Sequence, residues 1–426
     1  MKIKTAISVD HLIGTPLCWI LNIITRCVGL ILKRDHKPPY HIKKILIIKL
    51  MGIGSIVQAL PLIEGLSRRY PKADIRMLCF PETEIFAKRL TLVSEVFTVD
   101  NRSFLKLGWT ALKKIITIIR WRPDLVLDLE YHSKFSSLLT TMTCALNRAG
   151  LFDAATRFRY YLHTHWIYAN PRRHISDLYN HLGRVFGVES FKSLGDCAPC
   201  IRIGAIEEAE ADRVLTQHSI DPRENIFVIN VNAGELCLER KWPSQNFATL
   251  SEHMTKAGTV LLVGSPGERN YVESVRDLIT NNAIRMKVHN FAGKLSFGAF
   301  LAILKQATIV ITNDSGPMHL AALLDAHVVS LWGPGIPSTY EPRTPKHVPL
   351  WEDVFCSPCL YIVPEPPCGG NNICMQSLTV RKVLEAVYKQ VPELSTLKLR
   401  TLSYDEPARH MDRQSPRRES TEADHP

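Results

Sequence analysis

The sequence predicts an α/β protein with two doubly wound parallel sheets, preceded by an amphipathic helix. Two observations support this fold class. The chain has 426 residues, more than one hydrophobic core usually serves, and strand-like apolar runs alternate with helical stretches in two separate series. We expect a helix and linker over residues 1–40, domains over 41–205 and 206–395, and a disordered polar tail over 396–426.

The N-terminal region contains a long apolar stretch, LIGTPLCWILNIITRCVGLIL, over residues 12–32. Its polar residues, among them Cys18, Asn22 and Arg26, recur every three or four positions, which predicts one polar stripe on an otherwise apolar helix. Such a helix can lie in a membrane interface, and the basic flank over residues 33–44 suits anionic headgroups. The alternatives are a helix packed on the protein's own surface and a transmembrane span.

The first series of strands begins with KKILIIKL, followed by a turn containing Gly52 and Gly54 and by a helix from about Ser55 to Arg69. ADIRMLCF, VSEVFTVD and PDLVLDLE repeat the strand pattern. After the helical run IEEAEADRVLTQHS, the second series comprises NIFVINVNAG, GTVLLVGSP, MKVHNFAG, ATIVITNDSG and HVVSLWGPG. Ligands of such sheets bind beyond the carboxyl ends of the strands, so the loops there are the predicted sites of chemistry.

Charge and cysteine usage narrow the classes of partner. A formal net charge of +11 favours partners that carry phosphate. Nucleic acid is not expected, because the basic residues are scattered and no helix-turn-helix, RNP or zinc-finger spacing occurs. Eleven cysteines would suit a disulfide framework only behind a secretory signal, and no small-residue cleavage site follows the first apolar run. We therefore expect a reducing, cytosolic compartment.

The stretch TNDSGPMHLAALLDAHVVSLWGP predicts a ligand site. After a strand, Ser315 can cap the next helix, Gly316 allows a ligand close to the backbone, and Pro317 suits the first helical turn. Free amides at a helix start bind anions, so we expect a nucleotide diphosphate to be held there. The predicted site comprises Asp314, Ser315, Gly316, Pro317, Met318 and His319.

Together with KILIIKLMGIGSIVQALPLIEGLSRRYP and RKWPSQNFATL, this stretch resembles the ADP-heptose:lipopolysaccharide heptosyltransferase family, glycosyltransferase family nine. The similarity covers about residues 42–390, with the three motifs in the family's order. The resemblance implies a GT-B architecture, in which two Rossmann-like domains face each other across a cleft. It also implies an N-terminal domain for a lipid-linked sugar acceptor and a C-terminal domain for an ADP-sugar donor.

The resemblance implies further donor-binding residues. In family members a basic residue just before the tryptophan of RKWP binds the donor diphosphate, and Arg240 or Lys241 occupies that place. VGSPGERNYVESV resembles the segment whose acidic residue bonds the donor ribose, so Glu268 is the candidate; an exposed glutamate at a helix start is the alternative. Since Arg240, Lys241 and the helix start at Ser315 can neutralise the leaving diphosphate, no divalent cation or other cofactor is required.

The catalytic base is where the sequence departs from the family pattern. The family transfers sugar with inversion, and in many members the first strand is followed by Gly-Asp, with the aspartate assigned as base. Here the pair is Gly54-Ser55. A serine hydroxyl cannot accept a proton from another alcohol without a base of its own. Either the base has moved, or the chain binds its ligands without transfer.

Other groups could supply the base. The fourth strand ends in DLEYH, and period-two alternation places Asp128, Glu130 and His132 on one face of it. Glu130 is the preferred base, with His132 as its partner or substitute. Glu235, in the NVNAGE loop, would approach from the donor side.

Four cysteines lie close together in FCSPCLYIVPEPPCGGNNICMQSLTV, with the spacing C-x2-C-x8-C-x5-C. Four thiolates can bind zinc tetrahedrally, so a structural zinc site is one interpretation. Free packing thiols and disulfides are the others. The residues concerned are Cys356, Cys359, Cys368 and Cys374.

The whole pattern predicts an inverting glycosyltransferase of lipopolysaccharide core biosynthesis. It would move heptose or a related sugar from an ADP-sugar to a lipid-linked oligosaccharide at the cytoplasmic face of the inner membrane. A catalytically silent protein that binds nucleotide sugar or glycan is one alternative. A transferase that uses another nucleotide sugar is the second, because the sequence does not identify the base of the donor.

Overall fold

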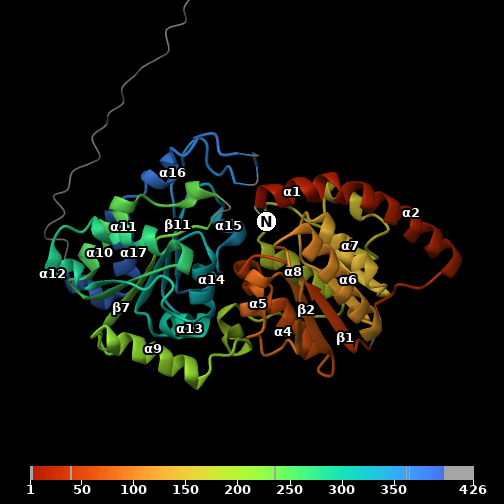
Figure 1. Cartoon of the computed structure of the whole chain (residues 1–426), viewed down its shortest axis with the longest axis horizontal. Helices are drawn as coiled ribbons and strands as arrows, with labels where there is room; N and C mark the ends of the chain where they lie inside the picture. The colour runs from red at the N-terminus through yellow and green to blue at the C-terminus, as the bar shows by residue number, and fades with distance from the viewer. Residues whose placement is uncertain (1–2, 39–40, 235–236, 361, 364, 398–426) are drawn as a thin grey trace, which may run out of the picture.

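The computed structural model describes residues 3–38, 41–234, 237–360, 362–363 and 365–397. Two lobes lie side by side, each built around a six-stranded sheet, and the N-terminal helices run along the edge of one lobe (Figure 1). The predicted class, α/β with two doubly wound parallel sheets and a preceding apolar helix, is confirmed. The predicted disordered tail falls almost entirely on residues 398–426, outside the described residues.

The first sheet has the strand order β3-β2-β1-β4-β5-β6, and all neighbouring strands are parallel. Its strands are β1 (Lys44–Ile48), β2 (Asp74–Cys79), β3 (Glu95–Thr98), β4 (Leu125–Asp128), β5 (Asn147–Phe152) and β6 (His165–Tyr168). Its helices are α3 (Ile53–Gln58), α4 (Leu60–Arg69), α5 (Pro81–Ala87), α6 (Phe104–Trp121), α7 (Lys134–Met142) and α8 (Ile175–Val185), with 3-10 turns η1 (Ala154–Arg159) and η2 (Gly195–Cys200).

The second sheet, β12-β11-β10-β7-β8-β9, is also parallel throughout. Its strands are β7 (Asn225–Asn230), β8 (Gly258–Val263), β9 (Val288–Asn290), β10 (Ile309–Asn313), β11 (Val328–Trp332) and β12 (His347–Trp351). Its α-helices are α9 (Ala205–Gln217), α10 (Ser244–Met254), α11 (Arg269–Asp277), α12 (Asn282–Arg285), α13 (Phe297–Gln306), α14 (Gly316–Leu323), α15 (Pro337–Tyr340), α16 (Ile373–Gln376) and α17 (Val380–Gln390). Its 3-10 turns are η3 (Leu238–Arg240), η4 (Pro266–Glu268) and η5 (Pro392–Leu397).

In each sheet the first strand lies beside the fourth, and the strand order reverses between them. This switch point is where open α/β sheets bind ligands. The central strands β1 and β10 are almost completely buried, which explains their uninterrupted runs of Ile, Leu and Val. The two switch points, β1/β4 in the first lobe and β7/β10 in the second, therefore define where a site should lie.

Three strands, β5, β6 and β12, were not predicted. β6 and β12 lie at sheet edges, and β5 pairs directly with β6. Their sequences, NRAGLF, HWIY and HVPLW, are short or interrupted by polar residues, glycine or proline. Such segments become strands through their neighbours, because their own side chains lack a strand pattern.

The N-terminal stretch forms α1 (Ile3–Leu12) and α2 (Gly14–Leu32). The polar stripe of α2 faces the protein: the Asn22 side chain donates to the Phe158 carbonyl (2.9 Å), and Cys18 packs against the backbone of Lys134. Gly14 allows this approach, because a Cβ there would lie 2.8 Å from Lys134 Cβ. The apolar face of α2 therefore points outward, along the upper edge in Figure 1.

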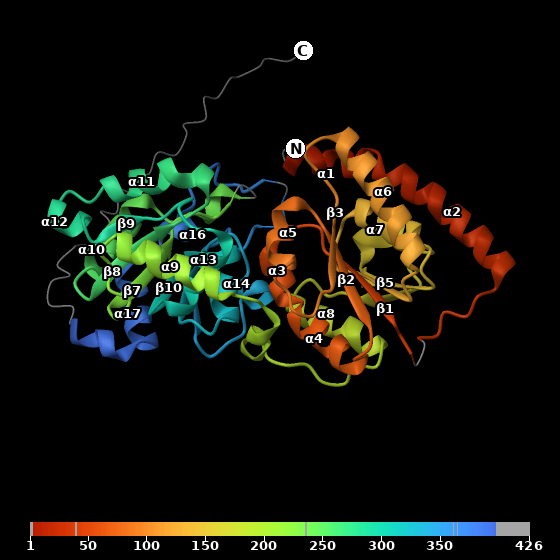
Figure 2. The ribbon, with the colours of Figure 1, turned by 60° about the horizontal axis from the view of Figure 1, so that its bottom comes forward.

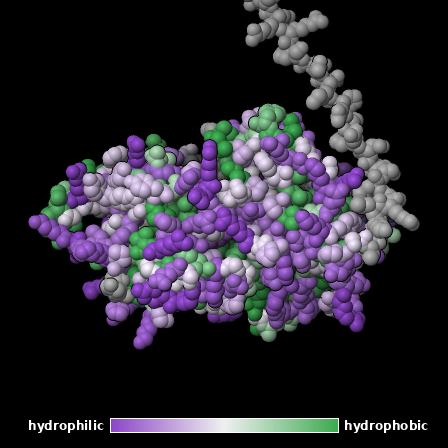
Figure 3. All heavy atoms as spheres, turned by 180° about the vertical axis from the view of Figure 1, so that it is seen from behind, coloured by the Kyte–Doolittle hydropathy of each residue, from purple (hydrophilic) through white to green (hydrophobic). Residues whose placement is uncertain are grey.

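One helical stretch in the described part of the chain, Ser8–Leu32, is long and apolar enough to cross a membrane, and only 11% of an 18-residue apolar window within it is buried. Seen from behind, the molecule is mainly hydrophilic, with hydrophobic residues in small groups (Figure 3).

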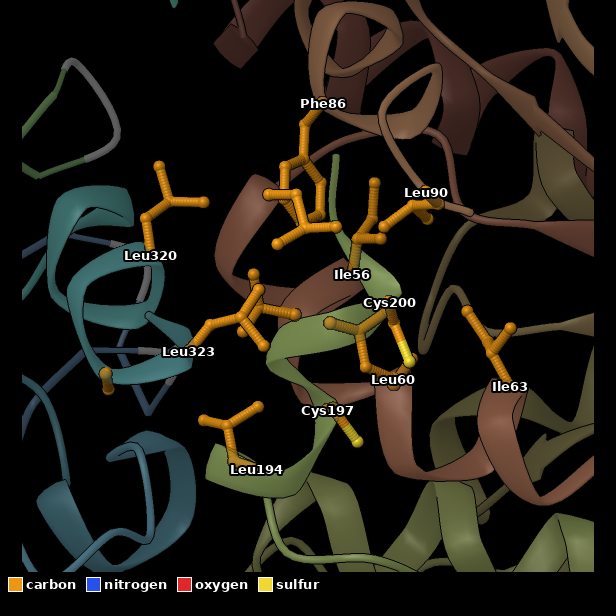
Figure 4. Packing of buried hydrophobic residues seen from close by; sticks show 14 of the residues in the cluster. Ile56, Leu60, Ile63, Phe86, Leu90, Leu194, Cys197, Cys200, Leu320 and Leu323 are labelled. Atoms are coloured by element: carbon orange, nitrogen blue, oxygen red, sulfur yellow. The ribbon is translucent and has the colours of Figure 1, made fainter. Parts of the chain in front are cut away.

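One hydrophobic cluster runs through both lobes. Figure 4 shows where it crosses between them: Ile56 and Leu60 of the first lobe lie across from Leu320 and Leu323 of α14. The helices that follow β1 and β10 are therefore in contact. Because each follows the carboxyl end of its strand, the two switch points face each other.

Candidate functional site

The turn between β10 and α14 has free backbone N–H groups where the helix begins. The backbone N–H groups of Ser315 and Gly316 have no acceptor within the described residues, and a Cβ at Gly316 would meet no atom within 4 Å. The Met318 amide donates to the Ser315 carbonyl (3.2 Å) and so is already occupied. The predicted amide cradle thus consists of Ser315 and Gly316, with Pro317 shaping the turn.

Ser315 does not cap α14 with its side chain. Its hydroxyl instead accepts from the Asn230 amide (2.9 Å) and donates to the Asn313 carbonyl (3.1 Å). The expectation of a Ser315 side-chain cap was therefore wrong, because the end of β7 competes for the hydroxyl. Asn313 in turn donates to the carbonyls of Val231 and Asn232. These bonds lock the carboxyl ends of β7 and β10 together at the switch point.

Arg240 lies at the same turn. Its Nη1 donates to the Asp314 carbonyl (2.9 Å) and lies 3.6 Å from the Asp314 carboxylate, while Nη2 donates to the Ala233 carbonyl (2.5 Å). Burial raises the pKa of Asp314, and Arg240 opposes that rise. The guanidinium is fixed beside the open amides, which places a positive charge where an anion would bind.

Lys241 points elsewhere: its ammonium lies 4.0 Å from the centre of the Tyr271 ring, a cation–π contact. Of the two basic candidates, Arg240 is therefore the one at the β10–α14 turn. Glu268 uses Oε2 to accept from the amide and hydroxyl of Ser265 (2.7 and 2.8 Å), a capping box at η4. This arrangement leaves Oε1 for a further partner.

The sequence did not identify Asn232 as a site residue, yet its side chain has an unusual environment. Its side chain is 3% exposed, and neither amide atom has a hydrogen-bond partner within the described residues. Unsatisfied buried amides are rare, because each costs about 1–3 kcal/mol. Asn232 follows β7 and faces Gly264 at the end of β8. The feature of the sequence that could have indicated this residue is its position directly after a strand, in NVNAG.

At the switch point of the first lobe, the turn after β1 is filled. Glu130 Oε1 accepts from the ammonium of Lys49 (2.9 Å) and from the backbone amides of Leu50 (2.7 Å) and Met51 (3.2 Å). The Glu130 and Lys49 side chains are 13% and 7% exposed. A carboxylate of the chain itself thus occupies the place in which free amides would receive an anion. Glu130 Oε2 has no partner within the described residues.

The Asp128 carboxylate has other side-chain partners than Glu130, although its Oδ1 accepts from the Glu130 backbone amide (3.1 Å). It is completely buried and bonds to Ser136 (3.0 Å) and Arg159 (3.3 Å), with His163 also at 3.3 Å. Burial alone would raise the pKa of Asp128, but Arg159 and His163 outweigh it and hold the pKa below its ordinary value. The expectation that Asp128, Glu130 and His132 share a strand face was wrong, because β4 ends at Asp128 and alternation stops there.

The remaining acceptor-side candidates are placed as follows. Ser55 is half-buried in α3, and Gly52 has a left-handed conformation (φ 87°) at its start. His132 is exposed, with its ring against that of Tyr131. Glu235 lies outside the described residues.

His319 connects the two turns. Its Nδ1 is 3.1 Å from the Gln58 side-chain nitrogen, which also donates to the carbonyls of Tyr340 and Glu341. Because that nitrogen is the donor, His319 Nδ1 accepts, and its proton resides on Nε2. Burial and the nearby His347 and His174 lower the pKa of His319 to about 3, so the ring is neutral.

The edge of the His319 ring lies against Gly54. A Cβ at Gly54 would lie 2.4 Å from His319 Cδ2 and 2.9 Å from Nε2. Sequence reasoning assigned Gly54 to the acceptor-side turn and His319 to the donor side. The structure brings the two together across the lobes, and Gln58 is the unpredicted residue that holds them there.

The described part of the cysteine loop has no metal-binding geometry. No group of three or more potential ligands within the described residues is arranged to hold a metal ion. All four cysteines of the loop are free thiols. Burial raises the pKa of Cys374 to about 11, which favours a packed thiol at that position.

The arrangement suits anion binding between two lobes. Two free amides, a fixed guanidinium and an unsatisfied side-chain amide line the second switch point, and the neutral imidazole of His319 on α14 contacts the first lobe. The Glu130 carboxylate lies at the first switch point. Such a site can hold a phosphate-bearing ligand without a metal and present it to a group bound against the first lobe.

Comparison with known proteins agrees with this geometry. The model of glycosyltransferase family 9 (heptosyltransferase) matches residues 117–365. Lipooligosaccharide heptosyltransferase 2 of Haemophilus influenzae is 32% identical over 149 residues, which are 35% of this chain and 43% of that protein. The chain spans about half the length of the curated relatives it first matches.

Two solved structures share the fold over most of the chain. The glycosyl transferase family 9 protein from Veillonella parvula superposes with a TM-score of 0.68 at 20% identity, covering 84% of this chain and 100% of that one. The E. coli ADP-heptose lps heptosyltransferase II gives a TM-score of 0.66 at 19% identity, covering 82% and 99%.

Proposed function

The chain belongs to glycosyltransferase family 9, and from that membership we propose that it is an inverting glycosyltransferase of lipopolysaccharide core biosynthesis. The proposed donor is an ADP-sugar, with ADP-heptose first, because the E. coli structure of the same fold is named for ADP-heptose. The proposed acceptor is a lipid-linked oligosaccharide at the cytoplasmic face of the inner membrane. The outward apolar face of α2 supports this location.

One observation carries the proposal: the open amides of Ser315 and Gly316 lie beside the fixed guanidinium of Arg240. A leaving diphosphate gains negative charge as the sugar bond breaks, and prearranged amides and a guanidinium stabilise that charge. We propose that these groups hold a pyrophosphate without a divalent cation. Glu268 Oε1 and Asn232 are proposed to face the nucleoside, since both side chains approach Gly264 at the end of β8.

On the acceptor side, Glu130 remains our proposed base, through the Oε2 atom that no group of the described chain engages. It would take the proton from the acceptor hydroxyl as that oxygen attacks the anomeric carbon opposite the diphosphate. His319, fixed with its proton on Nε2, would act as a hydrogen-bond donor between the lobes. His132 is the alternative base; Glu235 is proposed only as a donor-side group.

Donor titration by calorimetry tests this assignment. Arg240→Gln is expected to weaken ADP-heptose binding about 100-fold, since it removes a charge-assisted contact to the diphosphate. The neighbouring variant Lys241→Gln, which removes the same charge, is expected to change the affinity less than about threefold. Equal losses of affinity in both variants would contradict the proposed site, because the effect would then follow from the lower net charge alone.

A catalytically silent binding protein is the second candidate, favoured by two observations. Ser55 stands where many family members have an aspartate, and Lys49 already balances the charge of Glu130. An ADP-release assay that combines the purified chain with ADP-heptose and lipid acceptor separates the two candidates. ADP release that Glu130→Gln abolishes favours transfer; tight donor binding without release favours the silent protein.

A transferase with another nucleotide sugar is distinguished by competition. A panel of unlabelled ADP-, UDP- and GDP-sugars is expected to show ADP-sugars as the strongest competitors. A structural zinc at the cysteine loop stays a proposal of its own, and metal analysis of the purified chain would test it.

A further inference from the structure

Helix α6 carries an apolar stripe that faces away from the sheet. Its inner residues, among them Ile115 and Ile118, pack against the same face of the first sheet as α7. Its outer residues recur at helical spacing and are all exposed: Leu105, Trp109, Leu112, Ile116 and Ile119. An apolar stripe of this length on a surface helix normally marks a partner.

Helix α2 presents a second apolar face on this side of the lobe. α7 contacts both α2 and α6 and lies between them in Figure 1; Figure 2 shows α6 and α2 close together from another direction. Since Cys18 and Asn22 attach α2 by its polar edge, its apolar residues cannot turn inward. They include Leu17, Trp19, Ile20, Ile23, Ile24, Val28, Leu30 and Ile31.

The charges around these two stripes have one sign. α6 contains Lys106, Lys113, Lys114 and Arg120 and no acidic residue, and α2 contains Arg26 and none. The Lys113 ammonium lies 4.6 Å from the centre of the exposed Trp109 ring, which combines a cation with an aromatic at the surface. Cations beside Trp and Leu are the pattern of helices that lie in the interface of an anionic bilayer.

We propose that α2 and α6 together form one docking surface for an anionic lipid bilayer, with both helices lying in the interface plane. The inference deepens the proposed function, on which it rests for a membrane-borne acceptor. The new element is α6: a single helix would let the lobe swivel on the membrane. Two attached helices fix the orientation of the first sheet.

Vesicle flotation with the full chain tests the surface, using phosphatidylglycerol–phosphatidylcholine vesicles and pure phosphatidylcholine vesicles. Leu105→Asp with Leu112→Asp alters α6, and Ile20→Asp with Ile24→Asp alters α2. The control pair is Ile206→Asp with Met286→Asp on the second lobe, which adds the same charge at exposed apolar positions. Leu105 and Ile206 are matched at 86% and 81% exposure.

The wild-type chain is expected to bind the anionic vesicles more tightly than the neutral ones. Each docking pair should weaken that binding about tenfold, through lost apolar insertion and added repulsion, and the control pair less than about twofold. An α6 pair that behaves like the control pair overturns the proposal. So does sedimentation showing a dimer that the α6 pair dissolves, which would assign the surface to a second copy.

The outcome is independent of catalysis. Binding is measured without donor or acceptor, so a chain that docks but transfers no sugar overturns the proposed function alone. A chain that transfers sugar to a detergent-dispersed acceptor but ignores anionic vesicles overturns the docking surface alone.

Discussion

Two strand-to-helix turns at the switch points, the one after β1 in the first lobe and the one after β10 in the second, are in opposite states. After β1, the amides of Leu50 and Met51 and the ammonium of Lys49 close on Glu130, a carboxylate of the chain itself. After β10, the amides of Ser315 and Gly316 have no acceptor within the described residues, and the Arg240 guanidinium lies beside them. A strand-to-helix turn at a switch point therefore serves as an internal tie in one lobe and as a candidate ligand site in the other.

The contrast between the closed and the open turn shows that one fold, present twice in the chain, can serve two different functions. A turn whose amides are hydrogen-bonded within the chain adds stability and presents a defined surface. A turn whose amides are free can donate them to a ligand. Substitutions that break the tie at the first turn should therefore lower the free energy of unfolding, whatever they do to turnover. Substitutions at the second should change mainly ligand affinity.

The largest expected effect is that of Glu130→Ala on the free energy of unfolding. It leaves the buried ammonium of Lys49 and two amides without an acceptor, and we expect a loss of about 3 kcal/mol. Urea unfolding measures the change. Glu385→Ala is the control, because its partner Arg381 is 71% exposed, so less than about 1 kcal/mol is expected. Equal effects of both variants would mean that the first turn is not held by its carboxylate.

Gly54→Ala should destabilise the fold by about 2 kcal/mol, because the new methyl group overlaps the His319 ring. Thermal unfolding measures it, with Gly108→Ala on the open side of α6 as the control. Combining Gly54→Ala with His319→Ala should remove most of the penalty. If the double variant shows the full sum instead, the two turns do not meet as described.

The stability should also fall with acid between about pH 6.5 and pH 3. The pKa of His319 is about 3 in the folded chain, below its ordinary 6.5, so the unfolded chain binds the proton first. The contribution is complete above pH 6.5 and is lost as the pH falls, by about 2 kcal/mol from pH 7 to pH 5. Urea unfolding of His319→Gln should show a shallower pH dependence; identical slopes would refute the buried neutral ring.

Gly316→Ala should leave the free energy of unfolding unchanged, since a Cβ there meets no atom of the chain. It should lower the affinity for ADP-heptose about tenfold, because the methyl group occupies space that the diphosphate needs near the amides. Paired calorimetry and thermal unfolding separate the two quantities. A destabilised chain with unchanged affinity would reverse the contrast between the turns.

The smallest expected effect is that of Ser55→Ala on turnover, within about threefold, because a hydroxyl without its own base cannot accept the proton. Glu130→Gln, measured in the same ADP-release assay, should lose about 10² to 10⁴ in kcat if it is the base. A comparable loss in Ser55→Ala would shift the catalytic role to the serine.

Sequence reasoning predicted the strands whose burial on both faces demands an apolar run, such as β1 and β10. It also predicted the turn at Gly316, because glycine and proline at a helix start have a local meaning. It missed the closed state of the first turn, since Lys49 and Glu130 are 81 positions apart and meet only when β1 pairs with β4. The contact of Gly54 with His319 depends on the docking of two lobes and has no local signal.

The orientation of α2 could not be predicted for a different reason. Helical periodicity shows that two faces exist, but it does not show which one the protein takes. Here the inward face is selected by a backbone carbonyl, that of Phe158, and by close approach at Gly14. Neither is visible in the pattern of side chains.

The hydrophobic cluster that crosses from Ile56 and Leu60 to Leu320 and Leu323 makes the lobes cooperative. Because the helices of each half complete the other's core, separating them would expose apolar surface on both. Heating should therefore melt the whole molecule in a single calorimetric peak, and either half expressed alone should aggregate.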